Sequence, residues 1–182
     1  MPRTPKDGVC RQIYGCAAAR PPTLDATLTV AQIKSAHEHW LAQLAALELV
    51  ESSFRRKRGV PPIPKIVDAL GPDWQAAVGR LPRTLATYLS DIRPRIVALC
   101  SEAPVGSQLH RYRTTVTTQV DAIIDEARCW QQKAERALAP NASTRDMSTA
   151  LRLCQRLLRD VIMVSQDLHA VADPGSVRIR RA

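Results

Sequence analysis

The sequence contains few aromatic residues and few glycines. Only 4% of its 182 residues are Phe, Trp or Tyr, and only 7 are Gly. Aromatic and β-branched side chains favour strands, whereas the apolar residues here are dominated by Ala and Leu, which favour helices. A chain of this length can bury one ordinary hydrophobic core. We therefore expect an all-α protein without the glycine loop that cradles phosphates in nucleotide-binding enzymes.

Long apolar runs are also missing. No stretch of 18 apolar residues occurs, and the first residues, Met1 to Lys6, are not followed by the apolar core of a signal peptide. The five cysteines are scattered and odd in number, which suits a reducing compartment better than a disulfide framework. These absences predict a cytoplasmic protein that does not bind membranes.

Residues for catalysis or metal binding are sparse. His37 and His39 lie two apart, so a helix would point them in nearly opposite directions, away from a shared metal ion. Cys10 and Cys16 lack the second cysteine pair that would complete a zinc ribbon. The Asp and His residues of segment 167–173 fall on different helical faces and accompany no nucleophile motif. We expect no enzymatic activity, no metal site and no cofactor.

The apolar periodicity predicts long helices separated by proline and glycine. Thr29 caps the first helix, with Gln32 three residues later as in a capping box. Short helices are expected over residues 64–70 and 73–80. A further helix spans 82–103, where Pro94 should kink or split it near Ser90.

Two more long helices complete the pattern, over residues 107–139 and 144–172. The threonine-rich stretch 114–118 weakens the first of them, because β-branched residues lower helix propensity, and a strand is the alternative there. Ser143 or Thr144 should cap the second. Trp40 and Trp130 lie on apolar stripes and are expected in the core.

These elements predict one domain, a bundle of about five helices. Three of the helices are long, and they surround a shorter middle segment broken by proline. The bundle should cover residues 24–175, between a basic N-terminal arm (1–23) and a basic C-terminal tail (176–182).

The charge is strongly positive and unevenly distributed. Lys and Arg number 26 against 17 Asp and Glu, which gives a formal net charge of +9. The excess falls in the two terminal segments and in the junction that follows the first long helix, whereas the segment 24–54 is acidic. Positive clusters of this kind bind phosphates without reading base sequence.

The last long helix adds a row of three arginines. Arg152, Arg156 and Arg159 fall at positions i, i+4 and i+7, so they share one face, and no acidic residue of the same helix lies between them on it. An uncompensated row would bind an external anion, and the planar guanidinium suits phosphate. The competing interpretation is a face that is solvated or paired within the protein.

The charge pattern therefore predicts a nucleic-acid-backbone interface. Its candidate residues are Arg55, Arg56, Lys57, Arg58, Arg93, Arg95, Arg111, Arg113, Arg152, Arg156, Arg159, Arg178, Arg180 and Arg181. The tyrosines are isolated and no aromatic-rich RNA-binding motif occurs, so contacts to RNA, DNA or a hybrid should reach the backbone rather than the bases.

In size, helical content and basicity, the chain resembles the small helical subunit of multisubunit CRISPR effector complexes. That resemblance implies a ribonucleoprotein partner assembly in antiviral defence, several copies in a row, and no nuclease activity of its own. The alternative is a helical adaptor or inhibitor whose basic patches meet an acidic protein surface. An adaptor should expose an apolar groove that the bundle leaves unburied.

Overall fold

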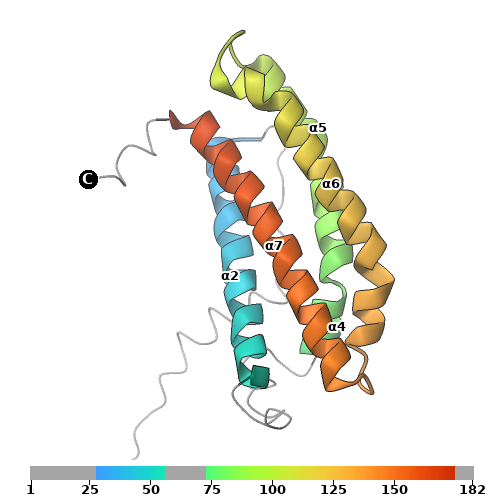
Figure 1. Ribbon diagram of the computed structural model, residues 1–182. Helices are drawn as coiled ribbons and strands as arrows, with labels where there is room; N and C mark the ends of the chain where they lie inside the picture. Colours follow the sequence, from blue (N-terminus) through green and yellow to red (C-terminus); the bar gives the residue numbers. More distant parts are fainter. Residues whose placement is uncertain (1–27, 56–72, 175–182) are drawn as a thin grey trace, which may run out of the picture.

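The computed structural model describes residues 28–55 and 73–174, and this part of the chain contains five helices and no strand (Figure 1). They are α2 (Val30–Arg55), α4 (Trp74–Gly79), α5 (Leu81–Glu102), α6 (Gln108–Ala137) and α7 (Thr144–Ala172). The predicted all-α bundle of about five helices is confirmed. The expected helix 64–70 and the basic segments 1–23 and 176–182 lie outside the described residues.

Side-chain caps begin three of the long helices, and two of them, at α2 and α7, were predicted from the sequence. At α2, Gln32 accepts a hydrogen bond from the Thr29 amide at 3.0 Å, while the Thr29 hydroxyl accepts one from the Gln32 amide at 3.3 Å. This reciprocal pair is the predicted capping box. Ser107 accepts from the amide of His110 at the start of α6, and Ser143 does so from that of Asp146 at the start of α7.

Two expected interruptions do not occur. Helix α5 continues through Pro94 over 22 residues, so of the expected kink or split the split is wrong, the kink stays a prediction, and α5 becomes a fourth long helix. Pro94 is exposed, which lets water satisfy the backbone carbonyl that loses its partner. The strand alternative at residues 114–118 is also wrong, because α6 runs unbroken through them. Within the helix, the Thr117 and Thr118 hydroxyls donate to carbonyls one turn earlier.

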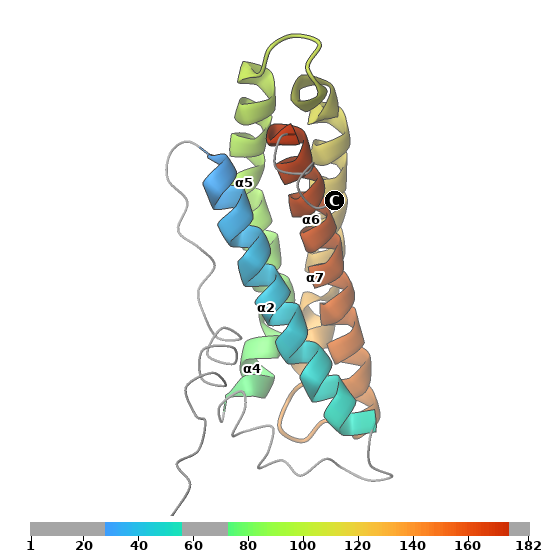
Figure 2. The ribbon, with the colours of Figure 1, turned by 90° about the vertical axis from the view of Figure 1, so that its left-hand side faces the viewer.

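The four long helices lie side by side along the length of the molecule (Figures 1 and 2). Helix α7 packs against α2 on one side and α6 on the other, and α5 packs against α6. The short α4 packs mainly against α6 at one end of the bundle. At the opposite end, the hairpin of α5 and α6 extends beyond α2 and α7. None of these helices is long and apolar enough to span a membrane.

The core is built from the apolar stripes of all five helices. Trp40 of α2 and Tyr88 of α5 are both buried, and their rings meet edge to face with centroids 5.2 Å apart. Trp40 is therefore a core residue, as predicted. Trp130 is not, because it is only half-buried and faces a groove between α6 and α7.

We predict that Tyr88→Phe leaves the free energy of unfolding at pH 7 unchanged or raises it by about 1 kcal/mol. The buried Tyr88 hydroxyl forms no hydrogen bond of normal geometry with a described residue and has only a weak polar contact with the Trp40 indole, so its removal costs little. Denaturant unfolding of both proteins measures the difference. A loss of more than about 1 kcal/mol would show that the hydroxyl is satisfied in solution.

The same variant should be less sensitive to alkali. Burial raises the pKa of Tyr88 to about 12, against a smaller lowering by the Trp40 indole. The unfolded chain ionises first, near pH 10, so the free energy of unfolding of the wild-type protein falls as pH rises from about 10 toward 12. In the Tyr88→Phe variant this fall should be smaller, and unfolding curves at pH 7, 10 and 11 test it.

Candidate nucleic-acid interface

The arginine row of α7 is paired within the protein. Arg152 contacts Glu51 of α2 at 3.1 Å, Arg159 contacts Glu48 of α2 at 2.8 Å, and Arg156 contacts Glu126 of α6 at 3.1 Å. The expectation of an uncompensated row is wrong, and the competing interpretation, a face paired within the protein, is confirmed. The acids come from neighbouring helices, which the spacing within α7 does not reveal.

These ion pairs link α7 to its two neighbours. Glu48 and Glu51 are three residues apart, so they lie on the same side of α2 and meet two arginines of α7. Next to them, the buried Gln155 donates to the Leu47 carbonyl at 3.3 Å. Part of the negative charge of the segment 24–54 is therefore neutralised by arginines of α7.

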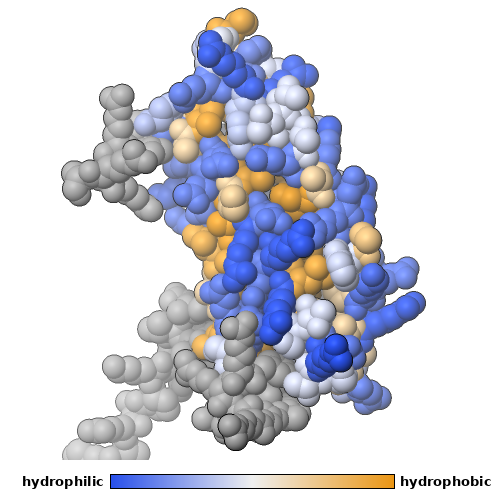
Figure 3. All heavy atoms as spheres, in the orientation of Figure 1, coloured by the Kyte–Doolittle hydropathy of each residue, from blue (hydrophilic) through white to orange (hydrophobic). Residues whose placement is uncertain are grey.

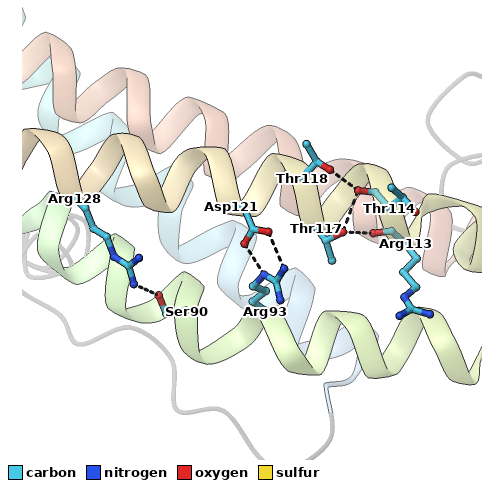
Figure 4. A network of polar contacts seen from close by, with 8 residues as sticks. All are labelled: Ser90, Arg93, Arg113, Thr114, Thr117, Thr118, Asp121 and Arg128. Carbon is cyan, nitrogen blue, oxygen red and sulfur yellow. Dashed lines mark hydrogen bonds and ion pairs between the residues drawn. The ribbon is translucent and has the colours of Figure 1, made fainter.

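A second group of arginines lies along the seam between α5 and α6 (Figure 4). Arg93 of α5 forms a two-bond ion pair with Asp121 of α6, at 2.5 and 2.7 Å. Further along the seam, Arg128 of α6 donates to the Ser90 hydroxyl of α5 at 3.3 Å. Arg113 lies at the other end of the view, with its guanidinium toward α5.

This seam opens into a polar hollow near the projecting end of the α5–α6 hairpin. Its volume is 470 Å³, and it is lined by Arg93, Val97, His110, Arg113, Thr114 and Thr117. The hollow brings together two of the candidate arginines, Arg93 and Arg113, which are 20 residues apart in the chain. A phosphate group entering it would meet guanidinium groups from two helices.

Hydrogen bonding determines which groups of the hollow can receive an anion. The Thr117 hydroxyl is committed to the carbonyls of Arg113 and Thr114, at 2.8 and 3.0 Å. Arg113 forms no ion pair with another described residue, and the buried Nδ1 of His110 lacks a hydrogen-bond partner there. Arg113 is therefore the most available donor, whereas Arg93 can offer an anion only the guanidinium N–H groups that Asp121 does not accept.

The charged groups along the seam between α5 and α6 also shift the pKa values of their neighbours. Hydrogen bonds from Arg93 lower the pKa of the Asp121 carboxyl, and the same bonds raise the pKa of Arg93. Burial raises the pKa of the Cys100 thiol, although the positive charge of Arg113 opposes this shift. The cationic state of Arg93 and the anionic state of Asp121 thus stabilise each other.

The other candidates are less well placed. Arg111 is exposed on α6 and does not line the hollow, and Arg95 lies on α5 outside its lining. The side chain of Arg55, together with Arg56, Lys57, Arg58, Arg178, Arg180 and Arg181, lies outside the described part of the chain. The structure therefore adds no geometry to these residues.

Arg83 and Arg128 also contribute to the seam, although they were absent from the candidate set. Arg83 forms an ion pair with Glu135 of α6 at 3.1 Å, and both arginines line a hollow of 250 Å³ that also contains Asp91. Both residues flank the apolar stripes of their helices, and that position is the available sequence signal. It could not identify the partner helix.

The described helices carry almost no net charge. Residues 28–55 and 73–174 contain 15 Lys and Arg against 14 Asp and Glu, a net of +1. The remaining +8 of the total +9 belongs to residues 1–27, 56–72 and 175–182. The described residues also contain no cluster of three potential metal ligands.

Exposure should separate the stability effects of two arginines in the row. Arg152→Ala removes a counter-ion from Glu51, whose side chain is 10% exposed, whereas Arg159→Ala removes one from Glu48, which is 49% exposed. We expect a loss of about 1–3 kcal/mol for Arg152→Ala and at most about 0.5 kcal/mol for Arg159→Ala, measured by denaturant unfolding. Equal losses would contradict this ranking.

Comparison with protein families, with curated proteins and with solved structures gives no match to this chain.

Proposed function

We propose that this protein is a non-catalytic subunit of a nucleoprotein complex that holds an RNA or DNA strand by its phosphate backbone. The observation that carries the proposal is the hollow lined by Arg93 and Arg113, in which guanidinium groups from two helices face the same 470 Å³ space. Arginine suits this role because its planar group can offer two hydrogen bonds to one phosphate.

The distribution of charge supports the same function. A bundle with a net charge of +1 is joined to segments that together carry +8. Arg56, Lys57, Arg58 and the C-terminal arginines belong to this excess, so they would add contacts to the phosphate backbone beyond those of the hollow. Binding of this kind releases counterions and weakens steeply with salt.

The aromatic residues support contact with the backbone rather than with bases. Trp40, Trp74 and Tyr88 are buried, and no Phe, Trp or Tyr lines the hollow. The hollow therefore offers phosphate contacts that carry no sequence information. Sequence specificity would then come from another subunit or from a guide strand.

The proposal includes the resemblance to the small helical subunit of CRISPR effector complexes. An all-helical fold of this size agrees with it, and the resemblance would place the chain beside an RNA-containing assembly in the cytoplasm. The alternative function, a helical adaptor, is favoured by one observation. A groove of 370 Å³ between α6 and α7 is lined mainly by apolar surface, as expected for a protein-docking site.

Binding to a labelled 30-nucleotide RNA, single-stranded DNA and duplex DNA, measured by fluorescence anisotropy at several salt concentrations, tests the proposal. We expect Arg93→Ala/Arg113→Ala to weaken binding similarly for unrelated sequences. The slope of log K against log salt should become shallower by about 0.7–0.9 for the lost contact of Arg113. The decrease should reach about 1.8 only if the guanidinium N–H groups of Arg93 that Asp121 does not accept also hold a phosphate.

Arg152→Ala/Arg159→Ala is the matched control, because it removes the same two charges from the face paired with α2. We expect it to change the slope less than the variant of the hollow. Equal effects would show that total charge, rather than the hollow, governs binding. If wild-type protein binds none of the three probes, the proposal fails.

Neutralising Arg55, Arg56, Lys57 and Arg58 to Gln tests the contribution of the basic junction. The expected result is a further loss of slope, by about 3 units if all four contact phosphates. Cross-linking that places this run away from the bound strand would remove it from the interface.

A further inference from the structure

The groove between α6 and α7 has an apolar floor and a cationic rim. Ala134 and Ala150 form its buried floor, and the half-buried Trp130 and Leu153 line it above them. The small alanines create the hollow, because they leave space that longer side chains would fill. Hydrophobic atoms are visible among hydrophilic side chains on the face that α6 and α7 present in Figure 3.

Three cations line this groove, and their ion-pair partners do not. Lys133 lies over the Trp130 ring, 4.5 Å from its centroid. Arg152 and Arg156 line the other side, where their side chains are 63% and 66% exposed. Glu51 and Glu126, which pair with them, are not part of the lining.

The single acid of the lining is already engaged. Asp146 accepts a hydrogen bond from the Ser143 hydroxyl at 2.6 Å, within the N-terminal cap of α7. An occupant of the groove therefore needs an apolar centre and negative flanks. A phosphate backbone does not meet this requirement, since it offers no apolar group to cover the alanines.

The outer face of α2 has this composition. Leu41 and Leu49 are two of the four large hydrophobic side chains that the described structure exposes, at 42% and 40%. With the exposed Ala45 between them they form a stripe at i, i+4 and i+8, and Glu38 and Glu48 flank it. We call these five residues the α2 stripe.

The α2 stripe and the groove also agree in length. Leu41 and Leu49 are eight residues apart, which is about 12 Å along a helix. The groove runs along α6 from Trp130 to Ala137, about 10.5 Å, and along α7 from Asp146 to Arg156, about 15 Å. A helix lying in the groove can thus place both leucines over the alanine floor while its glutamates approach the rim.

We propose that a second copy of this chain occupies the groove, with its α2 stripe packed between α6 and α7. In this arrangement Lys133 faces Glu38 of the incoming helix. Arg156 and Glu48, which pair with Glu126 and Arg159 in their own chains, add a contact at the rim by sharing those ion pairs. Each copy carries one stripe and one groove, so association yields either a closed two-fold dimer or an extended row. This interface is separate from the hollow between α5 and α6.

Sedimentation equilibrium without nucleic acid tests the proposal. Wild-type protein should exceed the monomer mass of 20.1 kDa in a concentration-dependent way. Leu41→Lys brings a cation to the cationic groove, and Leu153→Glu brings an acid to the groove that receives acidic flanks. Each variant alone should weaken association at least about tenfold, and Val105→Lys, at the 91% exposed tip of the α5–α6 hairpin, should leave it unchanged.

Mixing Leu41→Lys with Leu153→Glu provides the decisive measurement. One contact of the mixed pair is wild-type, and the other brings the introduced lysine to the introduced glutamate. Association should therefore return in the mixture, which also shows that both variants are folded. A monomeric wild-type protein at several hundred micromolar, or a mixture that stays monomeric while wild type associates, overturns the proposal.

The outcome is independent of nucleic-acid binding. Variants that no longer associate should still bind labelled RNA or DNA through the hollow of Arg93 and Arg113 if the proposed function is correct. Loss of self-association with retained binding, or the reverse, shows which of the two proposals fails.

Discussion

The arrangement of this bundle depends on the burial of α7 between two neighbours. Its residues Leu151, Cys154, Leu157 and Leu158 are fully buried, because α2 covers one side of the helix and α6 the other. A helix buried on two sides leaves a narrow outward strip, and on α7 this strip carries Arg152, Arg156, Arg159 and Met163. The arginines therefore lie at the two seams, where acids of the adjoining helices meet them.

The sequence was sufficient to predict the helices and their beginnings. Apolar periodicity located the long helices, Thr29 marked the start of α2, and the choice of Ser143 or Thr144 marked that of α7, where Ser143 is the cap. The cap at Ser107 was not predicted. The predicted split at Pro94 was wrong, because proline removes one hydrogen bond without ending a helix whose other bonds and packing are intact. Tertiary packing likewise overrode the low helix propensity of residues 114–118.

The contacts between helices could not be predicted from the sequence. Arg152 and Glu51 are 101 residues apart, and only the relative rotation and register of α2 and α7 bring them together. The burial of Trp130 failed as a prediction for a related reason. It lies on the apolar stripe of α6, yet its neighbours across the seam include Ala150, which is too small to cover an indole.

The candidate phosphate site was predicted only in part from the sequence. Arg93 and Arg113 were recognised as basic residues, but their convergence depends on the register between α5 and α6. The signal for Arg83 and Arg128 was weaker, since a cation beside an apolar stripe is a common surface feature. The packing of α5 against α6 determines the site, and no residue pattern within either helix alone predicts that packing.

The projecting end of the α5–α6 hairpin has a consequence for local stability. Beyond the ends of α2 and α7, the two helices have only each other to pack against, and Val105 at the tip is almost fully exposed. Amide protons there should exchange through local fraying of the hairpin, whereas those around Leu157 should exchange only through global unfolding. The hollow of Arg113 lies toward the less protected part, so a bound strand would slow exchange where the free protein opens most readily.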